Sequence, residues 1–295
     1  MEQFRNVGLM GRPGNLGVVD TLEYLQHFLE GRGLKVIYDE DTASLMQRPG
    51  LQVCSRSMLG EACDLVIVVG GDGSFLHAAR SLARFNKPVL GVNRGRLGFL
   101  TDVSPDKIDS KIGAVLDGDY AIEQRFLLNM EARSGGSPVG EGIALNDIVL
   151  HAGKSVHMIE FELFIEGQFV YRQRSDGLII ATPTGSTAYA LSGGGPIMHP
   201  RLDAMVLVPM HPHTLSSRPI VVDGNSEIKL LICSDDISPV VSCDAQTGPL
   251  LRSGDWVYVN KHPFKLRVIH PPGHDFYEAC RTKLGWSSHL TSPGD

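Results

Sequence analysis

An apolar run that ends in a cluster of glycines is the feature that most limits how this chain can fold. The run spans residues 65–69, and Gly70, Gly71, Asp72 and Gly73 follow it directly. A short run without polar interruption is typical of a strand buried on both faces, as in a parallel sheet. Open α/β sheets bind ligands at the carboxyl ends of their strands. We therefore expect a parallel sheet with Asp72 at its ligand-binding edge.

The first 120 residues read as an α/β domain. Short apolar runs alternate with helical patterns, which favours a doubly wound, Rossmann-like parallel sheet. The expected strands are 6–10, 35–38, 65–69 and 88–92. The expected helices are 18–29, 74–84 and 105–116. Ser104 followed by Pro105 marks the beginning of the last of these helices.

A different pattern begins after residue 120. Closely spaced strands with few helices predict an antiparallel β-sandwich. The expected strands are 126–132, 143–151, 156–165, 168–173, 177–182, 205–208, 228–233, 240–243, 256–260 and 264–269. Helical turns are expected at 186–191, and a helical tail at 274–286.

These patterns predict two domains. Residues 1–121 form the α/β domain that carries GGDG, and residues 122–270 form the β-rich domain. Residues 271–295 are expected to return to the first domain, because a β-sandwich offers a helix little room.

Composition narrows the class of protein. With 42% hydrophobic and 20% charged residues, the chain of 295 residues is expected to be globular. The net charge of −6, without a run of Lys and Arg, gives no indication of a nucleic acid or anionic membrane as partner. Five widely spaced cysteines favour a reducing compartment. Without a signal pattern or a long apolar run, the sequence predicts a soluble, cytoplasmic protein.

The glycine-rich segment predicts a phosphate site. Its spacing matches neither the dinucleotide fingerprint nor the Walker P-loop. Exposed glycine N–H groups, followed by a helix N-terminus near Ser74, favour phosphate oxygens. A carboxylate beside bound phosphates is repelled by them, so we expect Asp72 to have a chemical role. It can accept a proton from an attacking hydroxyl or help to hold Mg²⁺. The alternative is a tight turn in which Asp72 caps the next helix.

Two further motifs point to a ligand. Asn146 and Asp147 interrupt an otherwise apolar strand, and this pair suits vicinal hydroxyls such as a ribose diol. The alternative for the pair is a β-bulge or a turn. Residues 174–200 are rich in hydroxyl groups and glycines, which predicts a second polar cradle for a base or a phosphate. The alternative for this segment is a flexible surface loop.

In this order, the motifs GGDG, NDIVLH and TPTGSTAYALSGGGP resemble those of the NAD kinase family, close to its bacterial members. The resemblance extends through GLMGRPGN, GVNRGRLGFL, VSCDAQ and KLGW, so it covers nearly the whole chain. It implies two domains with the active site between them. It also implies transfer of the γ-phosphoryl group of ATP to the 2′-hydroxyl of the adenosine ribose of NAD, with Mg²⁺ as the divalent cation. A homodimer or homotetramer is implied as well.

The resemblance also implies which residues form the site. Asp72 matches the proposed proton acceptor, and no residue is assigned as a resident metal ligand. The residues expected to contact NAD are Asp72, Gly73, His77, Asn146, Asp147, His157, Arg174, Asp176, Thr187, Ala188, Tyr189, Ala190, Leu191, Ser192 and Gln246. One departure is that Ala245 precedes Gln246 where the family often has Gly. The extra bulk is expected to shift Gln246.

Three other functions compete with this one. A lipid kinase of the diacylglycerol type shares a GGDG loop but needs an apolar entry surface, whereas Asn146, Asp147 and the Thr/Ser loop suit a dinucleotide. A non-catalytic dinucleotide sensor would use the same binding residues, although a phosphate binder gains nothing from the charge of Asp72. A nicotinamide dehydrogenase is disfavoured, because the glycine fingerprint of dinucleotide-binding dehydrogenases is missing from this sequence.

Overall fold

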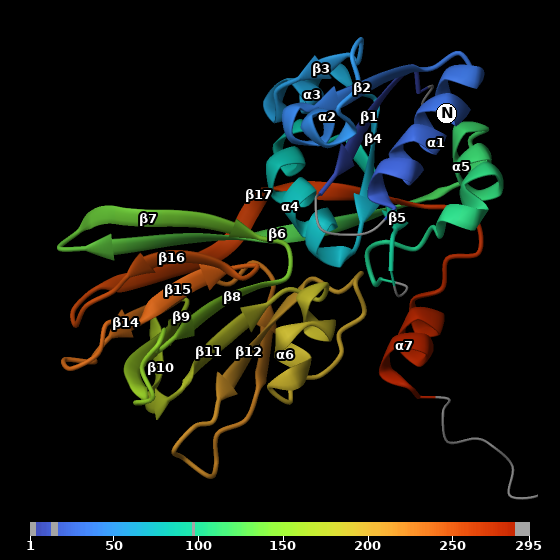
Figure 1. The fold of residues 1–295 in the computed structure, drawn as a ribbon. Coiled ribbons are helices and arrows are strands. Elements are labelled where there is room, and N and C mark those ends of the chain that lie inside the picture. Colours follow the sequence, from blue (N-terminus) through green and yellow to red (C-terminus); the bar gives the residue numbers. More distant parts are fainter. Residues whose placement is uncertain (1–3, 13–16, 96–97, 287–295) are drawn as a thin grey trace, which may run out of the picture. The chain divides into compact units, whose positions relative to one another are not determined.

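The computed structural model describes residues 4–12, 17–95 and 98–286 (Figure 1). The chain divides into two compact units. Unit 1 comprises Met1–Gln124 and Leu266–Asp295, and unit 2 comprises Arg125–Lys265. The chain passes from unit 1 to unit 2 within strand β6 (Ala121–Ser134) and returns within strand β17 (Trp256–His270).

Unit 1 is built on a parallel sheet. In spatial order its strands are β3 (Val53–Cys54), β2 (Lys35–Asp39), β1 (Asn6–Gly11), β4 (Leu65–Gly70), β5 (Pro88–Asn93) and the end of β17. Each neighbouring pair is parallel, with Leu9 opposite Ile67 and Val68 opposite Gly91. This is the doubly wound order 3-2-1-4-5-6, in which the direction of winding reverses between β1 and β4. The predicted parallel sheet is confirmed.

Helices cover both faces of this sheet. They are α1 (Val18–Gly31), α2 (Glu40–Met46), α3 (Arg56–Ala62), α4 (Asp72–Leu82) and α5 (Ile108–Leu116), with 3₁₀ turns η1 (Ala83–Phe85) and η2 (Pro105–Lys107). Helix α7 (Phe276–Leu284) also belongs to unit 1. Val7 and Leu9 of β1 pack in the core that α1 and α5 share. Gly8 faces the other way, where an added Cβ would lie 3.1 Å from Leu59 of α3. Every residue of β4 is buried, as expected for a strand covered on both faces.

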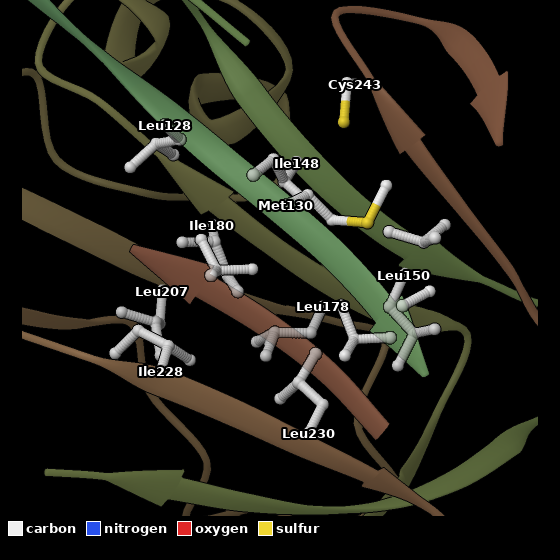
Figure 2. Packing of buried hydrophobic residues seen from close by; sticks show 14 of the residues in the cluster. Leu128, Met130, Ile148, Leu150, Leu178, Ile180, Leu207, Ile228, Leu230 and Cys243 are labelled. Atoms are coloured by element: carbon white, nitrogen blue, oxygen red, sulfur yellow. The ribbon is translucent and has the colours of Figure 1, made fainter. Parts of the chain in front are cut away.

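Unit 2 is a sandwich of two antiparallel sheets. One contains β7 (Ser137–Ala144), β6, β17, β14 (Ile228–Ile232), β9 (Ile159–Ile165) and β10 (Gln168–Ser175). The other runs β13 (Ile220–Asp223), β12 (Ala204–Met210), β11 (Gly177–Ala181), β8 (Asp147–His151), β15 (Val240–Cys243) and β16 (Gln246–Leu250). Figure 2 shows Ile180 and Leu207 gathered with Ile228, which comes from the facing sheet. Alternate residues of both sheets fill one core, which confirms the predicted sandwich.

Several element boundaries differ from the prediction. The expected strands 256–260 and 264–269 form one continuous strand, β17. The expected strand 143–151 is broken by a bend at residues 145–146. Helix α4 begins at Asp72, two residues before the expected position. The helical turns near 186 are η3 (Gly185–Thr187) and α6 (Tyr189–Ser192).

Elements β3, α2, α3, β13 and β16 were not predicted. Each is too short for its periodicity to stand out in the sequence. Strand β7 was also not predicted, apart from its last two residues, because its residues are mostly exposed or half-buried and form no apolar run. Residues 287–295, part of the segment expected to return to the first domain, lie outside the described residues. Within the described ranges, no helix combines the length and the apolar character that crossing a bilayer requires.

Candidate functional site

Asp72 lies where the strand order of unit 1 reverses. Strand β4 ends at Gly70, and Asp72 is the first residue of α4, which Gly71 precedes as N-cap. Gly70 has a φ of 154°, and an added Cβ would lie 2.4 Å from Ser74 Oγ, so the chain itself requires glycine there. Ligands of doubly wound sheets bind at this switch point, outside the carboxyl ends of the strands. The fold therefore places the GGDG segment at the expected ligand position.

Gly71 and Gly73 are different, because none of the residues that the structure describes requires them to be glycine. At either position, an added Cβ would meet no atom of the described residues within 4 Å. Neither residue has a positive φ. Bare backbone beside the N-terminus of α4 allows a ligand to approach closely, and helix N-termini favour anions. The pattern supports a phosphate ligand.

The Asp72 carboxylate faces a loop that follows β5. Its Oδ2 accepts the N–H of Phe99 at 3.0 Å, and its Oδ1 accepts the N–H of Leu100 at 3.1 Å and the hydroxyl of Thr101 at 3.3 Å. A Cβ on Gly98 would lie 2.1 Å from Oδ1, so glycine is needed for this close approach. Asp72 does not cap its own helix, because α4 has no side-chain capping bond. That alternative interpretation is wrong.

A lysine from the far end of the chain completes the contacts of Asp72. Lys283 of α7 donates to Asp72 Oδ2, with its Nζ at 3.1 Å. The same ammonium lies 4.8 Å from the centroid of the Phe99 ring. Phe276 of α7 also packs near Phe99, with ring centroids 6.5 Å apart, and Cys280 of α7 is fully buried. These contacts anchor α7 in unit 1 and bring Lys283 to Asp72.

His77 lies further along α4 and is surrounded by cations. Its Nε2 contacts the guanidinium of Arg56, and Arg80 approaches its Nδ1 at 3.5 Å. Burial and the charge of Arg56 lower the pKa of His77, which favours the neutral imidazole. Arg56 is also paired with Asp39 at 2.9 Å and with Asp41 at 2.7 Å. His77 is therefore part of an ion-pair network within unit 1.

In unit 2, the Asn146–Asp147 pair lies at a bend that a remote carboxylate holds. Asp244 accepts the backbone N–H groups of Leu145 at 2.9 Å, Asn146 at 2.8 Å and Asp147 at 3.3 Å. The bend separates β7 from β8, whose first residue is Asp147. The turn considered from the sequence is therefore present, and it presents two polar side chains.

Both side chains at the bend are poised for polar contacts. Asp147 is 5% exposed, and burial together with the charge of Asp244 raises its pKa to about 7. Asn146 Oδ1 is buried and has no hydrogen-bond partner among the residues that the structure describes. A buried acceptor left unsatisfied costs about 1–3 kcal/mol, which a ligand hydroxyl would recover. Asn146 can accept, and Asp147 can accept or donate according to pH.

The hydroxyl-rich segment packs directly on this bend. Thr182 donates its hydroxyl to the carbonyl oxygen of Leu145 at 2.6 Å and accepts the N–H of Gly185 at 3.1 Å. A Cβ on Gly185 would lie 2.1 Å from the carbonyl oxygen of Asn146. Two motifs that the sequence presents separately thus form one structure. Thr182, Thr184 and Ser186 are buried, so the alternative of a flexible surface loop is wrong.

Residues 187–192, all six of which were predicted to contact NAD, differ in the exposure of their side chains. Tyr189 is 46% exposed and Ser192 is exposed, whereas Thr187, Ala188 and Leu191 are half-buried. Ala190 is fully buried and packs in a cluster with Met198. Only the exposed and half-buried members offer side chains to a ligand.

The other predicted residues lie at loop and strand ends of unit 2. His157 is exposed in the loop between β8 and β9. Arg174 is an exposed residue of β10, and its carbonyl oxygen accepts the N–H of His213 at 3.0 Å. Asp176 lies between β10 and β11, with its Oδ2 2.9 Å from His211 Nδ1.

Gln246 follows a two-residue hairpin turn. Asp244 and Ala245 have φ values of 46° and 60°, and Cys243 pairs with Gln246 across the turn. Such turns need a positive φ at both positions, which explains why the family often has Gly at the second. Ala245 is exposed, so its methyl group is accommodated sterically. The substitution of Ala for Gly at this position instead strains the backbone, because a positive φ is unfavourable for Ala.

The predicted residues divide between the units. Asp72, Gly73 and His77 belong to unit 1, and all others belong to unit 2. Sequence reasoning missed the roles of Lys283 and Asp244, although both lie in motifs noted for the family resemblance, KLGW and VSCDAQ.

Among the described residues, one group of three could hold a metal ion: Asp102, His270 and His274. Both imidazole Nδ1 atoms lie 2.9 Å from Asp102 Oδ2, and the rings stack 3.6 Å apart at 19°. A metal ion binds the in-plane lone pair of an imidazole, and in two rings stacked face to face these lone pairs lie in separate, nearly parallel planes and do not converge on one ion. The three side chains are better described as a hydrogen-bonded group, in which both histidines contact Asp102. Although burial alone would raise the pKa of Asp102, these bonds lower it to about 2.

Comparisons with known proteins agree over nearly the whole chain. The family model described as the ATP-NAD kinase N-terminal domain matches residues 7–120, and the one described as the C-terminal domain matches residues 145–271. An NAD kinase of Pseudomonas syringae pv. tomato is 61% identical over 296 residues, covering 100% of both chains. An NAD kinase of Alcanivorax borkumensis is 62% identical, covering 100% of this chain and 97% of its own length.

Solved structures show the same similarity. Yeast NADH kinase complexed with NADH has a TM-score of 0.89 at 27% identity, covering 99% of this chain and 91% of its own. An NAD kinase from Archaeoglobus fulgidus in complex with ATP has a TM-score of 0.73 at 24% identity, covering 94% of this chain and 98% of its own. The second likeness concerns the fold alone.

Proposed function

The chain belongs to the ATP-dependent NAD kinase family, and we propose that it transfers the γ-phosphoryl group of ATP to the 2′-hydroxyl of the adenosine ribose of NAD, giving NADP. The observation that carries the proposal is the position of Asp72, at the switch point of the sheet and beside two glycines, Gly71 and Gly73, that no contact with the described residues requires. Family membership favours a dinucleotide over the lipid substrate considered from the sequence.

Asp72 is the proposed general base. A ribose hydroxyl is a poor nucleophile, and a positioned carboxylate that takes its proton contributes about 10²–10⁴-fold to the rate. The backbone N–H groups of Phe99 and Leu100 hold one oxygen each, which fixes the orientation of the carboxylate. The remaining acceptor sites are then available to a substrate hydroxyl once their present donors move.

Asn146 and Asp147 are the proposed NAD-binding pair. The Oδ1 of Asn146, which accepts no hydrogen bond from a described residue, suits a hydroxyl donor. The buried Asp147 suits a diol whose two hydroxyls both donate and accept. The remaining predicted contacts are retained as part of this proposal, with Tyr189, Ser192 and Arg174 offering the more exposed side chains.

We propose that Mg²⁺ enters as part of the substrate MgATP. Mg²⁺ prefers oxygen ligands and keeps several of its waters, and so the histidine-rich group at Asp102 does not suit it. A cytoplasmic location and a homodimer or homotetramer remain predictions.

One assay tests the function. The purified chain is incubated with MgATP and NAD, and NADP is measured with an NADP-specific coupled dehydrogenase. We expect NADP to form in proportion to enzyme and time. NAD binding without turnover would instead identify the dinucleotide sensor, and phosphate transferred to diacylglycerol would identify the lipid kinase.

A further inference from the structure

The Asp72 carboxylate is saturated with hydrogen-bond donors. A carboxylate has about four acceptor sites, two on each oxygen. Oδ1 accepts from Leu100 N–H and the Thr101 hydroxyl, and Oδ2 accepts from Phe99 N–H and Lys283 Nζ. A substrate hydroxyl can pass its proton to this carboxylate only if one donor leaves.

Lys283 is the donor best able to leave. The loop that supplies the other three is fixed, because Gly98 N–H bonds to the carbonyl oxygen of Thr101 at 3.1 Å. The loop also packs tightly on β5, where a Cβ on Gly91 would lie 2.7 Å from the carbonyl oxygen of Leu100. Lys283 instead reaches Asp72 through a flexible four-carbon side chain that is 25% exposed.

The reaction needs a cation at this place. The transferring phosphoryl group spreads negative charge over its equatorial oxygens, and kinases with a Walker loop place a lysine on it. This chain has no Walker motif, and its carboxylate base would repel the γ-phosphate. Lys283 brings a positive charge to within 3.1 Å of that base, inside the same unit.

We propose that Lys283 is a phosphate-binding residue of the kinase reaction. When ATP arrives, its ammonium moves from Asp72 Oδ2 to the γ-phosphoryl oxygens, which opens Oδ2 to the ribose hydroxyl. The bond from the 2′-oxygen to the γ-phosphorus then forms, and the bond from that phosphorus to the β,γ-bridging oxygen breaks. The hydroxyl proton passes to Asp72 Oδ2, and ADP leaves with the electron pair. Lys283 stays protonated throughout.

This inference rests on the proposed function, and its test is kinetic. Lys283→Met and Lys283→Ala should lower kcat/KM for MgATP by about 10²–10³-fold, the range found when one donor to a transition-state anion is removed. The dissociation constant for NAD should stay within about twofold. Lys283→Arg keeps the charge and should retain more activity than Lys283→Met. Methylammonium or ethylammonium should restore part of the activity of Lys283→Ala, since it returns a cation to the vacated space.

Arg281 provides a matched control on the same helix. Its guanidinium pairs with Asp275 at 3.3 Å rather than with Asp72. Arg281→Met therefore removes a cation from α7 and should leave kcat/KM for MgATP near the wild-type value.

Two results would overturn the inference. One is Lys283→Met with an unchanged kcat/KM for MgATP. The other is a loss of activity that accompanies a lower melting temperature and that no alkylammonium ion restores, because Lys283 would then only hold α7 in place. An inactive wild type would refute the proposed function itself, whereas an active wild type with an unaffected Lys283→Met would refute this inference alone.

Discussion

Replacing Asp72 by Asn changes one atom and tests both the chemistry and the local structure. In the wild type, each carboxylate oxygen accepts one backbone N–H, from Leu100 on Oδ1 and from Phe99 on Oδ2. The Asn amide has only one oxygen. Whichever way it turns, its NH₂ group faces a backbone N–H donor, and that N–H loses its acceptor.

The magnitudes follow from these contacts. An N–H left without its acceptor costs about 1–3 kcal/mol, and 1.4 kcal/mol is a factor of ten, so the loop should open about 5- to 150-fold more readily. Loss of the general base should lower kcat by about 10²–10⁴-fold. The affinity for NAD should change far less, because Asn146 and Asp147 belong to the other unit and keep their contacts.

Three measurements on Asp72→Asn separate these effects. The coupled NADP assay gives kcat, hydrogen exchange of the Phe99 and Leu100 amides gives loop opening, and calorimetric titration gives the affinity for NAD. Gly98→Ala is the companion variant: its Cβ would lie 2.1 Å from Asp72 Oδ1, so it displaces the carboxylate without removing its charge. It should lower kcat as well.

Particular outcomes would refute this reasoning. If Asp72→Asn kept kcat within a few-fold of the wild type, Asp72 would not be the base. If kcat and NAD affinity fell together by similar factors, Asp72 would be a binding residue. Unchanged exchange of both amides would show that the carboxylate does not hold the loop.

Two further predictions concern unit 2. The pKa of Asp147 is raised to about 7, so the folded state holds a proton that the unfolded state releases, and this contribution to stability is lost as pH rises from about 4 to about 7. Asp147→Asn should flatten that decline in urea unfolding between pH 4.5 and 8, and an unchanged slope would contradict the assignment. Ala245→Gly relieves a φ of 60° and should raise the free energy of unfolding by about 1 kcal/mol. Urea unfolding measures it, and a loss of stability would mean that the turn does not strain Ala245.

The sequence alone determined the elements whose signal is local. The uninterrupted apolar run before Gly70 specifies a buried strand, because hydrophobic periodicity reports how a segment meets the core. The alternation of strands and helices specified the parallel sheet, and the closely spaced strands specified the sandwich. The glycines around Asp72 marked the ligand-binding edge, since backbone exposed at a strand end is itself a local property.

Only the tertiary structure decided which remote groups meet at these motifs. Lys283 is 211 residues from Asp72 along the chain, and Asp244 is 98 residues from Asn146. Neither contact has a periodicity to reveal it, because each depends on how whole elements pack: α7 against the loop at Phe99, and the hairpin turn at Asp244 against the bend before β8. The sequence specifies which functional groups are present, whereas tertiary packing determines which residues, far apart in the sequence, contact them.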